Sequence, residues 1–433
     1  MSDNFVPQQA AVTQQERLIA FVLPIFICWF FIVFVAGAYL NRAPIEHLLS
    51  FLGNDTPGSF PGSVFPRPFG VHFFGDFLLP RWQSIRPSPW FESDIRATPL
   101  NNYTPFTMAV FYLFAQVSYW KSFIFLLFIS LVLIVLPIAL SVPKRTRLQT
   151  LSVLVFLTAP FISLIDRGNI QILLIGILLS SLFLFKNSKF RLSAVLLGLA
   201  IAMKGYPVFL LVLLVKARRW FDIALALTTT VLVTMIPLLF YEGGIIRNIS
   251  RMLRNIKLNE TEYAHAALAY NSSLKGFFLS VSSFSIPFAS AITDFLYDHY
   301  SVLILLISVA STLICIASRA NCFEATLLAV TLMTATVDYV APYALGLYFL
   351  PLIFINEWSP SMSNKKVVLI FVSWAFLLAP KGIPVAVWNT PLSSTATTYT
   401  SLFGGLCGFA ILATLVSSMI KTTRVNFLTQ KRA

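Results

Sequence analysis

The chain consists largely of apolar runs separated by short polar turns. A helix that crosses the hydrocarbon core of a bilayer needs about 20 apolar residues, or fewer where it is short or broken. About twelve runs meet this condition, and they predict an all-α polytopic membrane protein. A composition of 57% hydrophobic and 11% charged residues fits that class. The runs begin near Leu18, Ser122, Gln149, Asn169, Leu192, Pro207, Phe221, Asp298, Cys322, Ala341, Val367 and Ser401.

Two of these runs differ from the others. The first, Leu18 to Tyr39, is too long for a signal peptide and follows a polar segment, so we expect an uncleaved anchor. The stretch from Leu192 to Val215 has two short arms and is interrupted by Pro207. It is predicted to form either two short spans or a re-entrant pair.

The positive charge of the chain follows the turns. With a cytoplasmic N-terminus, 17 of the 31 Lys and Arg residues but only 5 of the 17 acidic residues fall on the cytoplasmic side. This distribution satisfies the positive-inside rule, so the net charge of +14 reflects topology and gives no reason to expect nucleic acid as a partner. We therefore expect one integral membrane domain, residues 1–433, with both termini in the cytoplasm.

The two faces of this domain are unequal. Two long segments, 41–121 and 241–297, lie on the outer side, whereas the cytoplasmic connections are short and basic. No phosphate-binding loop follows a strand, which argues against an ATP-driven pump or a nucleotide-sugar enzyme. The four cysteines lack metal-ligand spacing, so we expect neither a disulfide nor a zinc site. Any chemistry is therefore expected on the outer side.

The first outer segment is rich in proline and aromatic residues, which predicts short interfacial helices and turns. Asp76 stands out there because its neighbours are aromatic residues and glycine. Such surroundings would desolvate the carboxylate and raise its pKa toward the range of a general base. A structural role for Asp76, as a surface or helix-capping aspartate, fits these residues equally well.

In the second outer segment, residues 245–256 show the spacing of an amphipathic interfacial helix. Its polar face carries Arg247, Arg251 and Arg254. These arginines suit either a lipid phosphate or plain headgroup anchoring. Further along, His265 belongs to a polar cluster, and Asn271 suits either a sugar contact or a helix cap.

Charged residues also interrupt the apolar stretch between Asp166 and Trp220. A charge at the bilayer centre costs about 2.5 to 3.5 kcal/mol, so Asp166, Arg167 and Lys204 are candidates for a functional site. Asn169 lies one helical turn from Asp166, and a continuous helix would place both on one face. The same residues also suit structural roles, as a snorkelling lysine and a helix-capping ion pair.

Several short motifs carry a resemblance to a known family. They are Asp-Arg-Gly-Asn at 166–169, Lys-Gly-Tyr-Pro at 204–207, Gly-Asp-Phe at 75–77, Tyr-Thr-Pro-Phe at 103–106 and Asn-Ser-Ser-Leu at 271–274. Together, over residues 18–350, they resemble the membrane-embedded GT-C glycosyltransferases. The most similar type is the bacterial polyprenyl-phosphate-mannose-dependent alpha-1,2-mannosyltransferases.

The chain also departs from that family in three places. Residues 166–169 stand where many members have Gly-Gln-x-Asn, and Thr104 replaces a proline. Asp338-Tyr339 with Pro342-Tyr343 stands where mannosyltransferases usually have a histidine-bearing motif. These departures bear on the identity of the sugar more than on the type of reaction.

The resemblance implies an inverting hexosyltransferase of the bacterial plasma membrane that makes cell-envelope polysaccharide or glycolipid. It implies a polyprenyl-phosphate sugar as donor, a glycolipid or glycan as acceptor, membrane lipid as surroundings, and neither a metal nor a cofactor. Asp76 then corresponds to the catalytic base on the outer face. The donor phosphate is assigned to Lys204, Arg167, Arg251 and Arg254, and the sugar or substrate to Asp166, Asn169, Tyr103, His265 and Asn271.

Two other functions remain compatible with the sequence. A lipid-linked sugar flippase or transporter would line its path with polar groups, although the C-terminal half has no second copy of the polar motifs. An O-antigen ligase or polymerase would use a lipid-diphosphate donor, and the arginines of residues 245–256 together with His265 suit that chemistry.

Overall fold

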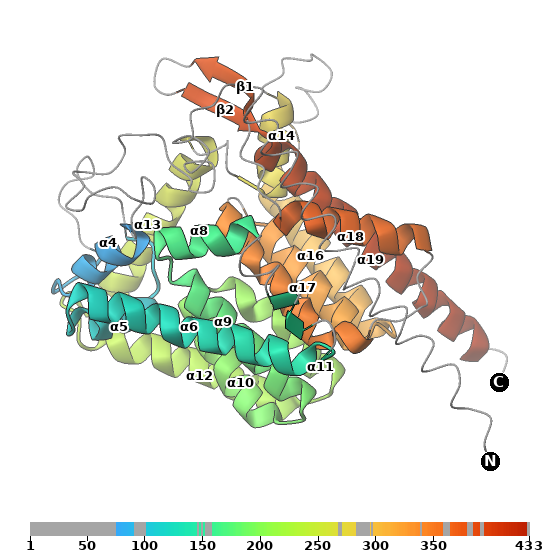
Figure 1. Ribbon diagram of the computed structural model, residues 1–433, viewed down its shortest axis with the longest axis horizontal. Coiled ribbons are helices and arrows are strands. Elements are labelled where there is room, and N and C mark those ends of the chain that lie inside the picture. The colour runs from blue at the N-terminus through green and yellow to red at the C-terminus, as the bar shows by residue number, and fades with distance from the viewer. Residues whose placement is uncertain are drawn as a thin grey trace.

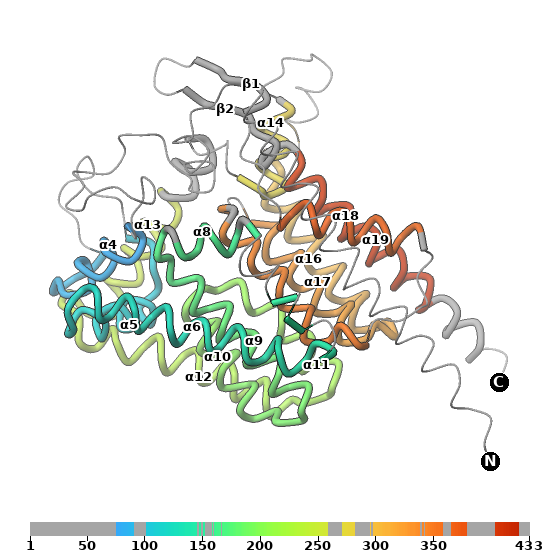
Figure 2. The backbone as a smooth tube through the Cα atoms, viewed as in Figure 1, coloured from blue at the N-terminus to red at the C-terminus, as the bar shows by residue number. Residues whose placement is uncertain are grey.

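The computed structural model shows a largely helical protein with a short two-stranded ribbon (Figure 1). It describes residues 75–90, 101–144, 147–148, 150–151, 158–266, 271–282, 295, 298–337, 340–357, 364–378, 384–389 and 394–430. The elements are α4 (Gly75–Ser84), α5 (Pro105–Ala115), α6 (Tyr119–Ser141), α8 (Ala159–Arg167), α9 (Gln171–Lys186), α10 (Phe190–Met203), the 3-10 helix η2 (Tyr206–Leu210), α11 (Leu211–Lys216), α12 (Trp220–Leu238), α13 (Gly244–Ala266), α14 (Leu274–Ser282), α16 (Tyr300–Ala317), α17 (Cys322–Ala335), η4 (Pro342–Glu357), α18 (Asn364–Leu378), β1 (Pro384–Asn389), β2 (Ser394–Thr398) and α19 (Tyr399–Gln430). Helices up to α13 occupy the left and lower part of the view, and α14 to α19 occupy the right (Figures 1 and 2).

The helices are those of a membrane protein. Within the described residues, α6, α12, α16 and the segment Phe403–Thr423 of α19 are long and apolar enough to cross a bilayer. Six further apolar helices are shorter. From Asn169 onward, every predicted apolar run coincides with a described helix, and the run near Ser122 coincides with α6. That twelve segments cross the membrane stays a prediction, and the run near Leu18 lies outside the described residues.

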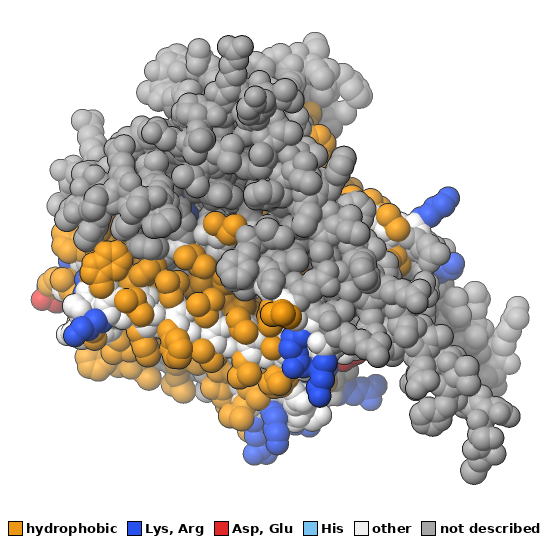
Figure 3. All heavy atoms as spheres, viewed as in Figure 1, with side chains coloured by type: hydrophobic (Ala, Val, Ile, Leu, Met, Phe, Trp, Pro, Cys, Tyr) orange, Lys and Arg blue, Asp and Glu red, His pale blue; other side chains and the backbone are white. Residues whose placement is uncertain are grey.

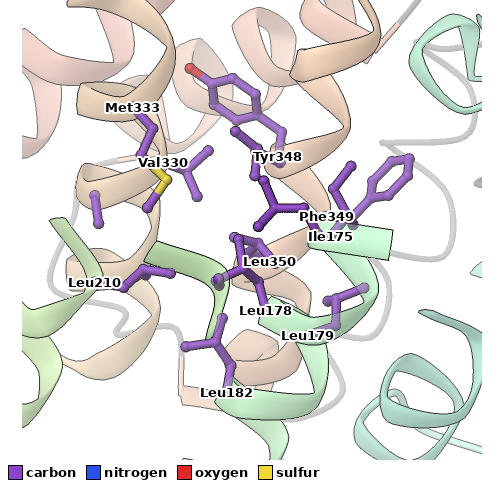
Figure 4. Close-up of a cluster of buried hydrophobic side chains, with 14 of the residues drawn as sticks. Ile175, Leu178, Leu179, Leu182, Leu210, Val330, Met333, Tyr348, Phe349 and Leu350 are labelled. Carbon is purple, nitrogen blue, oxygen red and sulfur yellow. The ribbon is translucent and has the colours of Figure 1, made fainter. Parts of the chain in front are cut away.

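Helix α9 lies at the centre of the packing, against α6, α10 and η4. Its side chains are buried almost all round, which explains why its sequence has no polar face. Figure 4 shows Ile175, Leu178 and Leu182 of α9 beside residues of α17 and η4. The core thus joins the two halves of the chain around one apolar helix.

Helices α10 and α12 approach each other closely at Gly198. A Cβ atom there would lie 2.5 Å from the carbonyl oxygen of Ala226 and 2.8 Å from Cβ of Thr229. The hydroxyl of Thr230 donates to the carbonyl of Gly198 across the same contact, at 3.0 Å. Small residues that let helix backbones touch are the usual means of packing helices inside a membrane.

The outward faces of α6 and α12 are apolar and exposed. Ile124, Phe125 and Phe128 of α6 are each more than half exposed, as are Val231 and Leu232 of α12. Figure 3 shows the resulting hydrophobic surface over α5 and α6, with lysines and arginines gathered along its lower edge. An apolar surface of this kind requires lipid around it.

Two basic turns, which were predicted to be cytoplasmic, have the same construction. Ser188 and Arg218 each take a left-handed backbone, with φ of 59° and 54°, directly after a helix. The preceding lysines donate to helix carbonyls elsewhere: Lys186 Nζ binds Ile353 O at 2.7 Å, and Lys216 Nζ binds Cys315 O at 2.9 Å. These lysines therefore satisfy carbonyl groups near the C-terminal ends of other helices as well as adding charge.

The two segments that were predicted to lie on the outer side contain helices, as expected. Helices α4 and α5 lie within 41–121, and α13 extends the predicted amphipathic segment 245–256 to Ala266. The antiparallel ribbon β1–β2, with Val387 paired to Ala396, was not predicted. It is a small addition to an otherwise helical fold, so the all-α class remains a fair description.

Candidate functional site

The carboxylate of Asp76 is held by two residues that are distant in sequence. Arg167 donates from Nε to Asp76 Oδ2 at 2.8 Å and from Nη2 to Oδ1 at 3.1 Å. Asn169 Nδ2 donates to Oδ2 at 2.7 Å. The Arg167 and Asp76 side chains are only 10% and 15% exposed, so this ion pair is well shielded from bulk solvent. Three hydrogen bonds of this kind stabilise the ionised carboxylate.

The local sequence explains how Arg167 and Asn169 reach the same carboxylate. Helix α8 ends at Arg167, and Gly168 takes a left-handed backbone with φ 62° and ψ 30°. Asn169 leaves the helix, and its Oδ1 accepts from the backbone N of Gln171 at 2.9 Å, at the start of α9. The Asn169 amide is thereby oriented with its Nδ2 donor toward Asp76.

This break corrects one expectation. Asp166 and Asn169 do not share a helical face, because glycine at C′ ends the helix between them. The side chain of Asp166 lies outside the described residues, so its predicted role in sugar binding is untested. The backbone of Asp166 belongs to the last turn of α8.

Helix α4 is anchored beside Asp76 by Phe77, which is fully buried. The Phe77 ring lies 5.6 to 6.0 Å from the rings of Phe111, Phe114, Tyr119 and Phe123. Such tilted aromatic pairs each add about 0.5 to 1.5 kcal/mol beyond their burial. The aromatic residue beside Asp76 therefore fixes α4, whereas the carboxylate itself accepts hydrogen bonds from Arg167 and Asn169.

Lys204 lies in the break between α10 and η2, outside both helices. Its backbone is extended, with φ −147° and ψ 128°. Its Nζ atom lies 4.9 Å from the ring centroid of Tyr103, which is cation–π distance. Burial lowers the pKa of Lys204 to about 8, although the negative charge of Asp76 acts in the opposite direction. The ammonium group and the Asp76 carboxylate therefore belong to one electrostatic site.

Two threonines fix the end of α10 next to Lys204. Thr104 Oγ1 donates to Ala202 O at 2.6 Å, and Thr107 Oγ1 donates to Met203 O at 2.9 Å. The last carbonyls of a helix have no partner within it, and these hydroxyls supply one. Thr104 is also the N-cap of α5, because its oxygen accepts from the backbone N of Thr107. Sequence reasoning noted Thr104 only as a replacement for proline and missed both functions.

A second contact was also missed. The hydroxyl of Tyr206 in η2 donates to Oε1 of Gln171 at 2.7 Å. Gln171 lies two residues after the Asp-Arg-Gly-Asn motif, and Tyr206 belongs to the Lys-Gly-Tyr-Pro motif, so this hydrogen bond joins the second motif to the start of α9, just after the first. The signal that could have found it was the tyrosine inside the second motif. Within the first motif, Arg167 lies over the ring of Tyr343, 5.5 Å from its centroid.

The other predicted site residues are placed differently. Asn271 is buried, and its Oδ1 accepts from the backbone N atoms of Ser273 at 3.0 Å and Val340 at 3.1 Å. Asn271 thus holds the turn before α14, whereas the side chain that caps this helix is Ser273, whose Oγ accepts from the backbone N of Gly276 at 3.1 Å. Arg254 is exposed on α13, and Arg251 lines a groove there. The side chain of His265 and the whole of Asp338 lie outside the described residues.

Comparison with known proteins identifies a family. The model of Glycosyltransferase family 87 matches residues 101–342, more than half of the chain. A search of curated proteins finds no match. The matched region contains Arg167, Asn169 and Lys204, whereas Asp76 precedes it.

Proposed function

We propose, on the basis that the chain belongs to glycosyltransferase family 87, that it transfers a hexosyl group from a polyprenyl-phosphate donor to a glycolipid or glycan acceptor. Membership of this family makes the chain a membrane glycosyltransferase, and its apolar helices agree with that. The nature of the donor, with mannose as the first sugar to test, rests on the motif resemblance.

One observation carries the proposal: a carboxylate lies within the same shielded site as two cations. Asp76 accepts from Arg167, and its charge acts on the partly buried Lys204. Displacement of a phosphate from a sugar needs a group that accepts a proton from the acceptor and groups that stabilise the leaving phosphate. The site provides both without a nucleotide-binding fold.

In the proposed reaction, the carboxylate of Asp76 takes the proton of the acceptor hydroxyl. The hydroxyl oxygen forms the new bond to the anomeric carbon of the donor sugar, on the face opposite the phosphate. The bond between that carbon and the phosphate oxygen breaks, and the electron pair leaves with the polyprenyl phosphate. The stereochemistry at the anomeric carbon is therefore inverted.

Lys204 and Arg167 bind the departing phosphate in this scheme. Arg167 is engaged with Asp76 by two hydrogen bonds. When the donor phosphate accepts hydrogen bonds from the Arg167 guanidinium, the hydrogen bonds from Arg167 to the Asp76 carboxylate become weaker, because the five N–H donors are then shared between two anions. Donor binding thus makes Asp76 a better proton acceptor, which couples the two halves of the site.

The location of the reaction follows from charge placement. The positive-inside distribution supports a site on the outer side of a bacterial plasma membrane, with both termini in the cytoplasm. Asn169 donates to Asp76 and Tyr103 lies beside Lys204, and this placement supports the proposal that both contact the sugar. For Asp166, His265, Arg254 and Asn271 a substrate contact is a hypothesis drawn from the sequence.

The decisive experiment offers the purified full chain a panel of polyprenyl-phosphate sugars with a lipid-linked acceptor and measures formation of the glycosidic bond. Asp76→Asn should abolish transfer while donor binding is retained. Asp222→Asn is a matched control, because Asp222 is also buried and paired to an arginine, Arg219 Nε, at 2.8 Å. Full transfer by Asp76→Asn removes Asp76 from the mechanism. Movement of the lipid across proteoliposomes with no new bond would instead favour a transporter.

A further inference from the structure

A groove with both apolar and cationic walls lies where α12 meets α13. Its volume is about 1050 Å³. The residues of interest in its wall are Leu238, Leu239, Ile246, Ser250, Arg247 and Arg251. The proposed reaction assigns no role to this groove as a whole.

The apolar wall belongs to a surface that faces lipid. Leu239 and Ile246 are 68% and 85% exposed, next to a helix long and apolar enough to cross a bilayer. Large apolar side chains so exposed at the end of such a helix are suited to acyl chains.

The cationic wall suits a phosphate. Arg247 and Arg251 are four residues apart on α13, so they stand on neighbouring turns. Both guanidinium groups line the same groove, and desolvation together with the positive charge of Arg247 lowers the pKa of Arg251. A phosphate that lies between two arginines can accept charge-assisted hydrogen bonds from both. The positive end of the α13 dipole, at Gly244, adds to the attraction.

The groove does not open toward the site around Lys204. Asn248 and Asn255 of α13 are buried, and Asn255 Nδ2 donates to Asn101 O at 3.0 Å, two residues before Tyr103. Ile246, Arg247 and Ser250 are exposed. The groove therefore opens on the side of α13 turned away from the buried asparagines.

We infer that this groove binds an anionic phospholipid of the surrounding bilayer. Its phosphate lies between Arg247 and Arg251, and an acyl chain lies over Leu239 and Ile246. The bound lipid fixes the connection between α12 and α13, and α13 in turn holds the segment that presents Tyr103 to Lys204. The inference stands independently of the identity of the sugar donor.

The test measures lipid retention by the purified full chain with native mass spectrometry. The probes are phosphatidylglycerol, phosphatidylcholine with the same acyl chains, and inorganic phosphate. Phosphatidylglycerol should be retained selectively, and Arg247→Gln and Arg251→Gln should each weaken it about fivefold. Lys257→Gln, which removes one positive charge from an exposed position outside the groove wall on the same helix, should change it less than about twofold.

Equal retention of the two phospholipids would overturn the inference, and so would an equal loss in all three variants, which indicates general charge attraction only. Displacement of phosphatidylglycerol by inorganic phosphate would show that the groove recognises free phosphate and not a lipid. If an arginine substitution prevents folding, Ile246→Ser tests the apolar wall, with an expected loss of about fivefold. Unchanged retention in that variant would also count against the inference.

Discussion

The guanidinium of Arg167 donates two hydrogen bonds, of 2.8 and 3.1 Å, to the carboxylate of Asp76, which lies 91 residues earlier in the sequence. The contact joins the end of α8 to the first turn of α4. Its planar, two-point geometry requires the guanidinium fork of arginine, which a lysine cannot reproduce. The first prediction concerns this geometry.

Arg167→Lys keeps the charge but loses one of the two hydrogen bonds. We expect kcat/KM for sugar transfer to fall about 10- to 100-fold, since a hydrogen bond to a charged group contributes about 1.5 to 3 kcal/mol. The measurement is initial-rate transfer with the lipid donor, at matched amounts of folded protein. An unchanged kcat/KM would mean that the pair is only structural.

Lys204 should make donor binding depend on pH. Its pKa is lowered to about 8 by burial, so the ammonium is present below that pH and is lost as the pH rises through it. A phosphodiester donor keeps its single charge over this range, and its affinity should therefore be constant below about pH 8 and fall above it. Donor binding measured from pH 6 to about 10 tests this.

The control for this pH profile is Lys204→Arg, which stays charged throughout. In that variant the decline above about pH 8 should disappear, even if the affinity itself is lower. A wild-type decline that begins only near the ordinary lysine pKa, or one that persists in Lys204→Arg, would assign the titration to another group.

Thr104→Val should loosen the end of α10. The change removes the hydroxyl that donates to Ala202 O and caps α5, and we expect a loss of about 1 to 2 kcal/mol in the free energy of unfolding. Thr228→Val, at an exposed position of α12, is the matched control and should have little effect. Thermal unfolding in detergent measures the stability of both variants. Equal unfolding midpoints would contradict the stabilising role of the Thr104 hydroxyl.

Transfer should persist in excess chelator. Arg167 and Lys204 already provide positive charge beside Asp76, and two cations can stabilise the charge that develops on a departing phosphate. The measurement compares transfer rates before and after treatment with EDTA. Loss of activity that Mg²⁺ or Mn²⁺ restores would replace this scheme with a metal-assisted one.

The sequence predicted the individual groups better than their contacts. Asp76, Arg167 and Lys204 were selected by their unusual surroundings, and Asn169 by its spacing from Asp166 and by its motif. Their mutual arrangement depends on the tertiary fold. It brings Asp76 within hydrogen-bonding distance of Arg167 and Asn169, which follow it in the sequence by 91 and 93 positions. No local pattern contains that information, and so Arg167 was assigned to the donor phosphate or to an ion pair with Asp166, and not to Asp76.

Local structure was predicted well where hydrophobicity was uniform and poorly where it was not. The long apolar helices such as α6 and α16 follow from run length. The error at residues 166–169 arose because helical spacing was applied across Gly168, where the backbone turns left-handed. Thr104 was missed because its partners, the carbonyls of residues 202 and 203, belong to a distant helix end.

The separation of the contacting residues also fixes an order of events during synthesis. Thr104 reaches its carbonyl partner across 98 residues, and Arg167 reaches Asp76 across 91. Because the ribosome delivers the chain from the N-terminus, α4 and α5 emerge long before their partners exist. A nascent chain that ends before α10 lacks the contact made by Thr104, and Asp76, Arg167 and Lys204 can come together only after α10 and the break at Lys204 have been synthesised.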